Sequence, residues 1–503
     1  MTTDFLHGVE VVEIDDGLRP IQIVKSAVIG IVGTAPDAQG ALTAARTLGL
    51  GDAGLTLTAQ AAGAAGNLIR VALRDPAAAG QTLAVAVDGT AITVTLATDG
   101  SGAITSTAED VKLAIEADAA AAALVAVTYP GTGDGSGVML AGAGTLAGGE
   151  DEPFPLNTPV LVAGNRIQTA KLDPAGARQG TLPRAMDLIF AETAPEIVVI
   201  RVAEGVDEAA TISNIIGGVD GTTEAHTGIY ALLAAQAATL VTPRILIAPG
   251  YSQNLAVAQA LVGVADQLRA FAYVTGPNTN RIDAIAFENQ IGSARCAIVD
   301  PFVRVWDSAT NGYIATPGDP TVAAITAKTD HERGFWWSPS NKVAGISGTA
   351  RPIPNTGPIG EANALTEHGI VTFIVDNGWR SWGNRTCSGD PLWAFIAVRR
   401  TADMIYESAE RAFLWAQDRP FSAQLLRDIQ DSVQAFMDNL VTRGASLGGT
   451  VWIDPDLNTE ATLKAGQLYL DFDFEPPAPM ERLTLRAHRN GGYYEELIAD
   501  VTA

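Results

Sequence analysis

The chain has 503 residues, of which 47% are apolar and 17% charged, a length that predicts three or four domains at about 100–200 residues each. Acidic residues outnumber basic ones by 56 to 32, and the net charge of −24 argues against a nucleic-acid-binding or anionic-membrane-binding protein, because both need a basic surface. Two cysteines, Cys296 and Cys387, exclude a disulfide scaffold and a thiolate zinc site; they fit a reducing cytoplasm and leave one bridge open.

Residues 1–20 are predicted to form an extended arm. Its apolar residues are interleaved with two glutamates and are Val9, Val11, Val12 and Ile14. This pattern is typical of a short strand, yet no partner strand lies nearby in the sequence, so an extended arm and an ordinary edge strand are both open. The first ten residues have neither a basic stretch nor an apolar run, and we expect no signal peptide.

The composition changes abruptly after residue 37, which predicts an inserted domain over residues 38–152. Its central part, residues 53–150, holds one aromatic side chain, Tyr129, among many Ala, Gly and Thr residues. Short alternating runs separated by turn signals predict strands, and one capping box that begins at Ser106 predicts a single helix. We therefore expect a small β-rich domain built from small side chains.

The chain on both sides of this insert, residues 21–37 and 153–360, is predicted to form one α/β domain. Its first part is a β-branched run, and in its second part buried-strand patterns alternate with helical patterns. The expected strands are 196–202, 244–248, 271–274 and 296–299, and the expected helices are 182–190, 226–239 and 254–268. The alternation indicates a layered α/β sheet, which a Pro- and Gly-rich linker at 351–360 would end.

Residues 361–503 are interpreted as a C-terminal domain. Helices are predicted at 402–416 and 423–443, and the second has one apolar stripe at three- and four-residue spacing. Strict alternation predicts strands at 467–474 and 481–488, with Asp and Arg side chains paired across them. The last segment is predicted to complete this sheet or to add a strand to another chain, and its apolar residues are Tyr493, Tyr494, Leu497 and Ile498.

Tryptophan and arginine gather in one short stretch before the predicted helices. The cluster consists of Trp379, Arg380, Trp382, Arg385 and Trp393. Both residue types are enriched at the energetic centres of protein interfaces, so the cluster is a candidate interface. A corner of the core held by cation–π contacts is the alternative, and the two interpretations are compatible.

The sequence has no recognisable catalytic or ligand-binding constellation. A Walker loop, a dinucleotide fingerprint and a nucleophile elbow are absent, and the five histidines lack metal-ligand spacing. The Gly-rich segments 131–137 and 217–221 are interpreted as loops rather than as anion sites. Apolar windows fall far short of the roughly 20 residues that span a bilayer. We predict no enzyme activity, no cofactor, no metal and no direct membrane insertion.

Several long segments resemble contractile phage tail sheath proteins. They cover about 1–37 and 153–503, in the order of the family, and leave out the insert at 38–152. The segments are FLHGVEVVEIDDGLRPIQIVKSAVIGIVGTAPDA near the start, FPLNTPVLV, WWSPSNK, NGWRSWGNRTCSGDPLWAFIAVRRTADMI and ERLTLRAHRNGGYYEELI near the end. The insert looks like the variable outer domains that such sheaths carry.

The resemblance implies a structural protein of the virion tail. Subunits would assemble in the host cytoplasm as stacked rings or a helix around an inner tail tube, in a metastable extended state between baseplate and tail terminator. Contraction would drive the tube through the host envelope for genome delivery, without nucleotide hydrolysis and without binding nucleic acid.

The resemblance also implies roles for particular segments. The arms with Val9–Ile14 and Tyr493–Ile498 would add strands to neighbouring subunits. The C-terminal domain would face the tube, so its arginines are candidates for pairing with tube carboxylates. These candidates are Arg411, Arg419, Arg427 and Arg443.

Three other interpretations remain at this point. The same sheath could serve a phage-derived bacteriocin or a contractile injection system that carries no genome. A multidomain α/β enzyme would need a convergent polar site, which the sequence does not show. A glycan-binding adhesin would need aromatic side chains for sugar stacking, and residues 53–150 have one.

Overall fold

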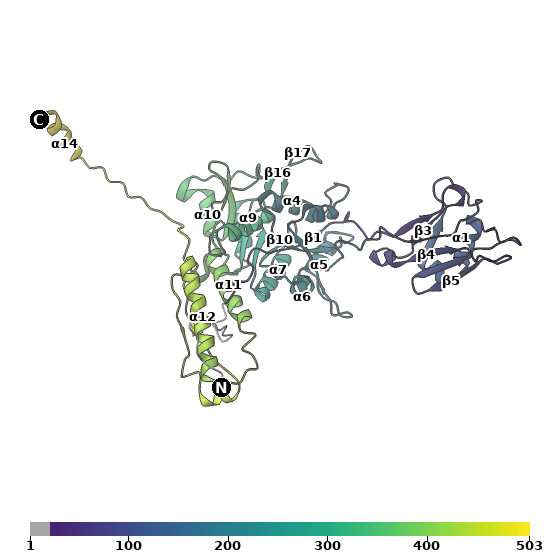
Figure 1. Ribbon diagram of the computed structural model, residues 1–503. Helices are drawn as coiled ribbons and strands as arrows, with labels where there is room; N and C mark the ends of the chain where they lie inside the picture. Colours follow the sequence, from purple (N-terminus) through teal and green to yellow (C-terminus); the bar gives the residue numbers. More distant parts are fainter. Residues whose placement is uncertain (1–20, 503) are drawn as a thin grey trace, which may run out of the picture.

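The computed structural model describes residues 21–502. Its centre is an eight-stranded sheet in the order β20-β19-β15-β14-β13-β1-β10-β9 (Figure 1). The six inner strands run parallel, and the two edge strands, β9 and β20, run antiparallel to them. The strands are β1 (Ile29–Thr34), β9 (Val160–Ala163), β10 (Glu196–Val202), β13 (Ile245–Ile247), β14 (Phe271–Thr275), β15 (Cys296–Val299), β19 (Ile370–Val375) and β20 (Trp379–Trp382).

Helices cover both faces of this sheet, which explains why its strands are apolar on both sides. In β1 and just before it, Ile29 and Ile31 pack into one core with α4 and α9, while Val28 and Val32 pack into a second core on the opposite face. The first face is covered by α4 (Leu182–Glu192) and α9 (Asp319–Glu332). The second is covered by α5 (Glu208–Ile216), η4 (Gly228–Ala234), α6 (Ala235–Thr239), α7 (Leu255–Leu268), α8 (Arg281–Glu288) and α10 (Glu361–Glu367).

The layered α/β sheet expected from the sequence is confirmed, and most of its elements lie where their patterns placed them. The strand at 196–202 is β10, and the strand at 296–299 is β15. The helix expected at 226–239 is a 3₁₀ helix followed by one short α-helix, η4 and α6. Smaller elements on the rim are α3 (Arg166–Thr169), η3 (Ala170–Leu172), β11 (Gly218–Val219), β12 (His226–Thr227), β16 (Val303–Asp307), β17 (Gly312–Thr316), β18 (Gly348–Thr349) and η5 (Gly357–Ile359).

The insert forms a body with its own apolar core, which Figure 1 shows at one end of the molecule. An antiparallel bridge between Leu42 and Glu150 closes its base. Its two sheets are β2 (Ala45–Leu48), β3 (Leu55–Ala59) and β7 (Val125–Thr128), and β5 (Ala84–Asp88), β6 (Ala91–Thr95), β4 (Arg70–Arg74) and β8 (Gly142–Thr145). Its helices are α1 (Ala108–Ala117), α2 (Ala119–Leu124), η1 (Gly51–Ala53) and η2 (Ala64–Leu68).

The helical part of the insert differs from the prediction in two details. The capping box lies one residue later than expected, on Thr107 and Asp110 rather than Ser106 and Glu109. A second helix, α2, follows directly, because the Asp118 carboxylate accepts hydrogen bonds from the backbone N–H groups of Ala120 and Ala121 and so caps a new helix start.

The C-terminal domain is built around two long helices, α11 (Ile396–Ala412) and α12 (Ala423–Arg443). Met404 and Ile405 of α11 share a core with Val433 and Phe436 of α12, and Figure 1 shows the two helices side by side. The bounds and the apolar stripe of α12 are confirmed, with Ser422 as N-cap. The remaining elements are η6 (Pro391–Trp393), β21 (Val451–Trp452), α13 (Glu460–Lys464), β22 (Asp471–Phe472) and α14 (Tyr493–Thr502).

The boundary between the α/β domain and the C-terminal domain lies later than the predicted residue 361. Residues 361–387 contribute α10, β19 and β20 to the central layers, with β19 parallel to β15. The linker expected at 351–360 is therefore a loop inside the α/β domain. It contains Arg351, whose guanidinium binds the buried Asp300 carboxylate at 2.5 Å.

The prediction of two strands near the C-terminus that pair with each other within the chain is largely wrong. The strand expected at 467–474 shortens to β22, which pairs with β21, and residues 481–490 are exposed and irregular. Cross-strand Asp–Arg pairs consequently do not form between these segments. The Asp473 carboxylate instead accepts a hydrogen bond from the Thr450 N–H at 2.6 Å.

The segment that carries Tyr493, Tyr494, Leu497 and Ile498 is the helix α14 rather than a strand. Apolar residues recur there at three- and four-residue spacing, and Glu495 and Glu496 stand in the first turn, where the helix dipole favours acids. The helix extends away from the body (Figure 1). The other predicted arm, with Val9, Val11, Val12 and Ile14, lies outside the described residues.

Candidate assembly surfaces

Helix α11 is bound to the α/β domain by a buried ion pair. The Arg400 guanidinium contacts the Asp330 carboxylate of α9 through two nitrogens, at 2.8 and 2.5 Å, and both side chains are at most 4% exposed. The same guanidinium donates to the Ser26 carbonyl oxygen at 3.3 Å. Such a fork-to-fork pair fixes both the distance and the orientation of the two helices.

A second ionic contact, one turn further along α11, centres on the buried Asp403. Its carboxylate accepts hydrogen bonds from Arg295, which precedes β15, at 2.9 and 2.6 Å, and from Arg399 at 2.7 Å. The Arg399 guanidinium also lies 3.9 Å from the centre of the Trp393 ring, a cation–π contact. Two arginines of different domains therefore converge on one carboxylate.

A third contact lies another turn along the same helix. The Glu407 carboxylate binds the buried Arg244, which precedes β13, and also Arg411 at 2.7 Å. Burial lowers the pKa of Arg244 to about 10, so it stays charged at neutral pH. We call the contacts of Arg400, Asp403 and Glu407 the α11 joint. They link one face of α11 to three separate elements of the α/β domain.

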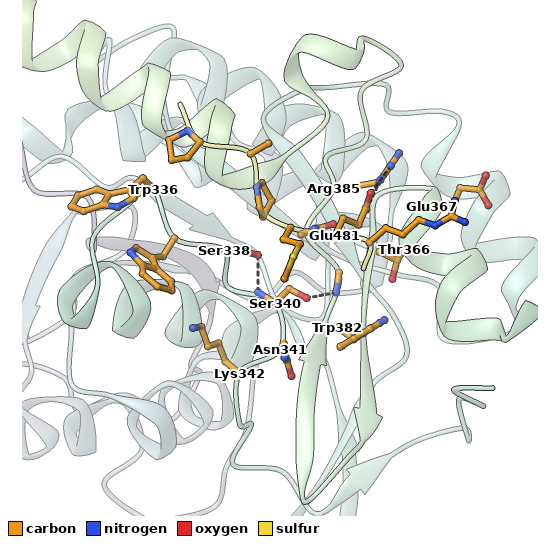
Figure 2. Close-up of a pocket in the computed structure, with 18 of the residues that line it drawn as sticks. Trp336, Ser338, Ser340, Asn341, Lys342, Thr366, Glu367, Trp382, Arg385 and Glu481 are labelled. Carbon is orange, nitrogen blue, oxygen red and sulfur yellow. Dashed lines mark hydrogen bonds and ion pairs between the residues drawn. The ribbon is translucent and has the colours of Figure 1, made fainter. Parts of the chain in front are cut away.

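A groove of about 1050 Å³ lies between the α/β domain and the C-terminal segment and is shown in Figure 2. Its wall from the α/β domain includes Trp336, Trp337 and Trp382, and residues 477–482 of the C-terminal segment form the opposite wall. The Ser340 hydroxyl accepts a hydrogen bond from the Gly383 N–H at 3.0 Å, which ties two loops of the wall together.

One ion pair holds the C-terminal segment across this groove. The Arg385 guanidinium donates to both carboxylate oxygens of Glu481 at 2.7 Å, and this hydrogen bonding raises the pKa of Arg385 (Figure 2). We call this contact the tail clamp. Beyond it, residues 482–501 are exposed. The clamp thus marks the place where the chain leaves the folded body.

The predicted Trp–Arg cluster is divided among three places. Trp379 packs against the first core of the sheet, and Arg380 beside it donates to the Asp376 carbonyl oxygen at 2.8 Å. Trp382 and Arg385 line the groove. Trp393 lies under Arg399 at the α11 joint. The structure therefore assigns core packing, groove wall and joint to residues that the sequence grouped together.

The four predicted tube-facing arginines also occupy different environments. Arg411 binds Glu407 and donates to the Thr242 hydroxyl at 3.0 Å, so it belongs to the α11 joint. Arg419 lies over the Trp415 ring, 5.0 Å from its centre. Arg427 is exposed on α12, and Arg443, at the other end of that helix, lines the groove. Their contact with a tube remains a prediction.

Apart from Trp393 and Arg411, the residues of the α11 joint were not identified from the sequence. The predicted helix began at residue 402, so Arg399 and Arg400 fell outside it. Their signal was present: Arg399, Asp403 and Glu407 recur at four-residue spacing, which places ionic side chains on one helix face. Charged residues within an apolar helix face indicate buried pairs.

Residues 21–502 contain neither a cluster of metal ligands nor a helix that could span a membrane. Among them, no three His, Cys, Asp or Glu side chains come together in a way that could hold a metal ion. No helix in this part of the chain is both long and apolar enough to cross a bilayer.

Two models of known protein families together match residues 224–489. The family model for the phage tail sheath protein central domain matches residues 224–387. The model for the phage tail sheath C-terminal domain matches residues 388–489. The border between the two matches coincides with the structural boundary between the α/β domain and the C-terminal domain.

Relatives of known name are tail sheath proteins. A prophage major tail sheath protein of Pseudomonas aeruginosa is 37% identical over 68% of this chain and 88% of that protein. The tail sheath protein of Escherichia phage P2 is 35% identical over 71% of this chain and 92% of that protein. That of Burkholderia phage BcepMu is 30% identical over 98% of both chains, so the alignment extends through the insert.

Solved structures with the same fold come from contractile machines. The helical sheath of the anti-feeding prophage in its contracted state has a TM-score of 0.52 at 22% identity and covers 66% of this chain and 89% of that one. The sheath complex of the PVC extracellular contractile injection system, also contracted, has a TM-score of 0.52 at 16% identity over 68% and 90%. At these identities the likeness concerns the fold.

Proposed function

The chain belongs to the phage tail sheath protein family and is a structural subunit of a contractile tail sheath; from this premise, we propose that its folded body moves as one piece during contraction while its two ends link neighbouring subunits. The α11 joint carries this proposal. Three ionic contacts bind α11 to the α/β domain, whereas the chain after Glu481 is exposed. A sheath needs both properties, because its subunits change position relative to their neighbours without losing their connections.

The short sheet of β21 and β22 supports strand exchange between subunits. Within residues 21–502 this sheet has two strands, so its edges have unpaired backbone groups. We propose that the arm at residues 4–14 and the segment at 481–490 of neighbouring copies add strands here. Main-chain hydrogen bonds of this kind depend little on side chains and tolerate large rotations of the linked bodies.

The length of the C-terminal segment suits this role. Residues 482–492 are described as irregular chain, and each extended residue spans about 3.3 Å, so this stretch alone reaches roughly 35 Å. That distance is about the width of a small domain. The alternating pattern that predicted a strand at 481–488 is therefore satisfied by a partner in another copy rather than within the same chain.

Assembly and contraction would then draw on contacts between copies. We propose as partners other copies of this chain, an inner tail tube, a baseplate and a tail terminator, with assembly in the host cytoplasm. The net charge of −24 makes copies repel one another, so charge pairs between subunits, with exposed arginines such as Arg427 and Arg482, would offset this repulsion. Contraction would be downhill if such pairs become more numerous in the contracted lattice.

A sheath of a genome-free injection particle is the second candidate. The solved structures named above include the sheath of an extracellular contractile injection system, which favours it. Sequence identities of 30–37% to sheath proteins of phages and a prophage favour the tail of a genome-carrying phage. Capsid and packaging genes beside the gene of this chain would indicate a genome-carrying phage. Their absence would indicate an injection particle.

Electron microscopy of the purified chain tests the proposed linkage. We expect the full chain to form hollow tubes in negative stain, and we expect a chain that lacks residues 1–14 to remain as single particles. A matched control that lacks residues 130–136, in the insert loop, should still form tubes. Tubes formed equally well without residues 1–14 would refute strand donation by that arm while keeping the sheath itself.

A further inference from the structure

Two buried cysteines meet where the α/β sheet leads into the C-terminal domain. Cys296 begins β15, and Cys387 follows β20 and ends the segment that matches the central sheath domain. Both are free thiols, and their side chains are 0% and 3% exposed. The ionic contacts of the α11 joint begin a short distance along the chain from each, at Arg295 and at Arg399.

The backbone holds the two residues side by side. The Cys387 N–H donates a hydrogen bond to the Cys296 carbonyl oxygen at 2.9 Å. Chains paired in this way lie about 5 Å apart, and disulfides join α-carbons separated by about 4.4–6.8 Å. The main-chain pairing therefore places the two residues within the range of separations that disulfides span.

The two side chains also lie in the same core. Both pack into the apolar core on the face covered by α7, α8 and α10. The neighbouring Cys296 thiol, together with burial, raises the pKa of Cys387. A weaker contact joins the Cys387 sulfur to the Gly369 carbonyl oxygen at 3.9 Å. Both side chains thus lie within one largely apolar environment.

Acidic and basic groups border the pair on its outer side. Glu288, at the end of α8, acts electrostatically on Cys387, and burial raises the pKa of Glu288 to about 7. The half-exposed His368 lies beyond it, with its Nδ1 atom 3.9 Å from a Glu288 carboxylate oxygen. An acidic and a basic side chain therefore stand near the buried thiols.

We propose that Cys296 and Cys387 form a redox site, which holds two thiols in a reducing compartment and closes to a disulfide when the protein meets a low-molecular-weight disulfide oxidant. The chemistry goes beyond the sheath role and does not depend on it. A closed bridge would tie β15 to the chain that leads into α11, and so reinforce the α11 joint covalently.

The reaction proceeds by two thiol–disulfide exchanges. One cysteine thiolate attacks a sulfur of the oxidant, forms a mixed disulfide and releases one thiol of the oxidant. The second cysteine thiolate attacks the protein sulfur of that mixed disulfide and releases the other thiol. The cysteines lose two protons and two electrons, and the oxidant is reduced to two thiols. Because both cysteines are buried and the pKa of Cys387 is raised, closure waits for local opening and is slow.

Mass spectrometry of the full chain tests the proposal. The protein is incubated with oxidised glutathione, quenched with acid and then unfolded in the presence of N-ethylmaleimide. We expect the intact mass to fall by two hydrogens, neither cysteine to be alkylated, and digestion to yield one peptide pair joined through Cys296 and Cys387. Dithiothreitol should restore both alkylations. Two alkylated cysteines, or glutathione retained on either one, would overturn the proposal.

Single substitutions provide the matched controls. In Cys296→Ala and Cys387→Ala the remaining cysteine has no partner, so oxidised glutathione should leave the intact mass free of the two-hydrogen loss. Oxidation should move the guanidinium midpoint of the wild type upward and leave the midpoints of both variants unchanged. An equal shift in a variant would contradict the bridge. If a variant does not fold, the presence or absence of the peptide pair joined through Cys296 and Cys387 in the wild type still tests the proposal.

Discussion

The α11 joint and the tail clamp attach the C-terminal domain and the C-terminal segment to the same α/β domain in opposite ways. The joint has three ionic contacts, and in the first of them, Arg400 with Asp330, both side chains are almost fully buried. The clamp has one ion pair, Arg385 with Glu481, and both side chains are about one third exposed. A buried pair is costly to break, whereas an exposed pair contributes little.

This difference separates what must stay rigid from what must be free to move. During contraction a sheath subunit changes its position relative to its neighbours, so forces from those neighbours act on its folded body. The joint lets the α/β domain and α11 bear such forces together. The clamp fixes where the terminal segment leaves the body, and under the proposed strand exchange its path beyond Glu481 is set by another copy.

Breaking the joint should have the largest effect. Arg400→Ala leaves the Asp330 carboxylate buried without its partner, and we expect a loss of about 3–5 kcal/mol in the free energy of unfolding. Guanidinium unfolding monitored by circular dichroism measures it. Lys464→Ala is the matched control, because it removes an exposed pair with Glu460 and should cost less than about 1 kcal/mol. Equal losses in the two variants would refute the distinction between buried and exposed contacts.

The pH dependence of stability sharpens the comparison, because its source lies in the rigid body. Asp319 begins α9, is fully buried, accepts a hydrogen bond from the Thr275 hydroxyl at 2.8 Å, and has a second carboxylate oxygen without a partner. Burial raises its pKa from 3.8 to about 7. The folded state therefore holds this proton more tightly than the unfolded state does.

The sign of the effect follows from this raised pKa. The stabilising contribution of Asp319 to the free energy of unfolding is fully present below about pH 4. It is lost as the pH rises through about 7, at up to roughly 1.4 kcal/mol per pH unit. Asp319→Asn should remove this slope, which chemical denaturation across the pH range measures as the difference from the wild type. Asp418→Asn, at an exposed site, should leave the slope intact. A difference between wild type and Asp319→Asn that does not change with pH would contradict the assignment.

Breaking the clamp should have the smallest effect on stability and a local effect on motion. Arg385→Ala should change the free energy of unfolding by less than about 1 kcal/mol. Amide hydrogen exchange should become faster in residues 477–482 and stay unchanged in α11. Arg380→Ala is the matched control, since Arg380 contacts Asn341 and Asp376 rather than the tail. Faster exchange in α11 would contradict this prediction, because it would show that the α11 joint opens when the tail clamp is broken.

The sequence predicts the inner strands well because each is a β-branched run buried by helices on both sides. The strands at 196–202 and 296–299 depend on that local pattern alone. By contrast, β19 was missed as part of the sheet because its place beside β15 depends on a pairing across some 70 intervening residues, counted from Val299 to Ile370, that include the helices α9 and α10. No local signal reports that pairing.

The terminal segments show a second limit of predicting structure from the sequence. Alternation at 481–488 describes a chain suited to a strand, yet a strand needs an edge to pair with, and residues 481–490 are exposed in a single copy. The α11 joint was missed for a related reason, since Arg400 and Asp330 are 70 residues apart in the chain. The partners of these charged side chains are set by the tertiary fold.

A cryo-EM reconstruction of the sheath assembled from this chain tests the central claim most directly. We predict that residues 21–37 and 153–475 superpose as one body on the structure described here, with Arg400 still bound to Asp330. We predict that residues 481–490 lie as a strand on the β21–β22 sheet of a neighbouring copy. An opened α11 joint, or a terminal segment folded back onto its own subunit, would contradict the account.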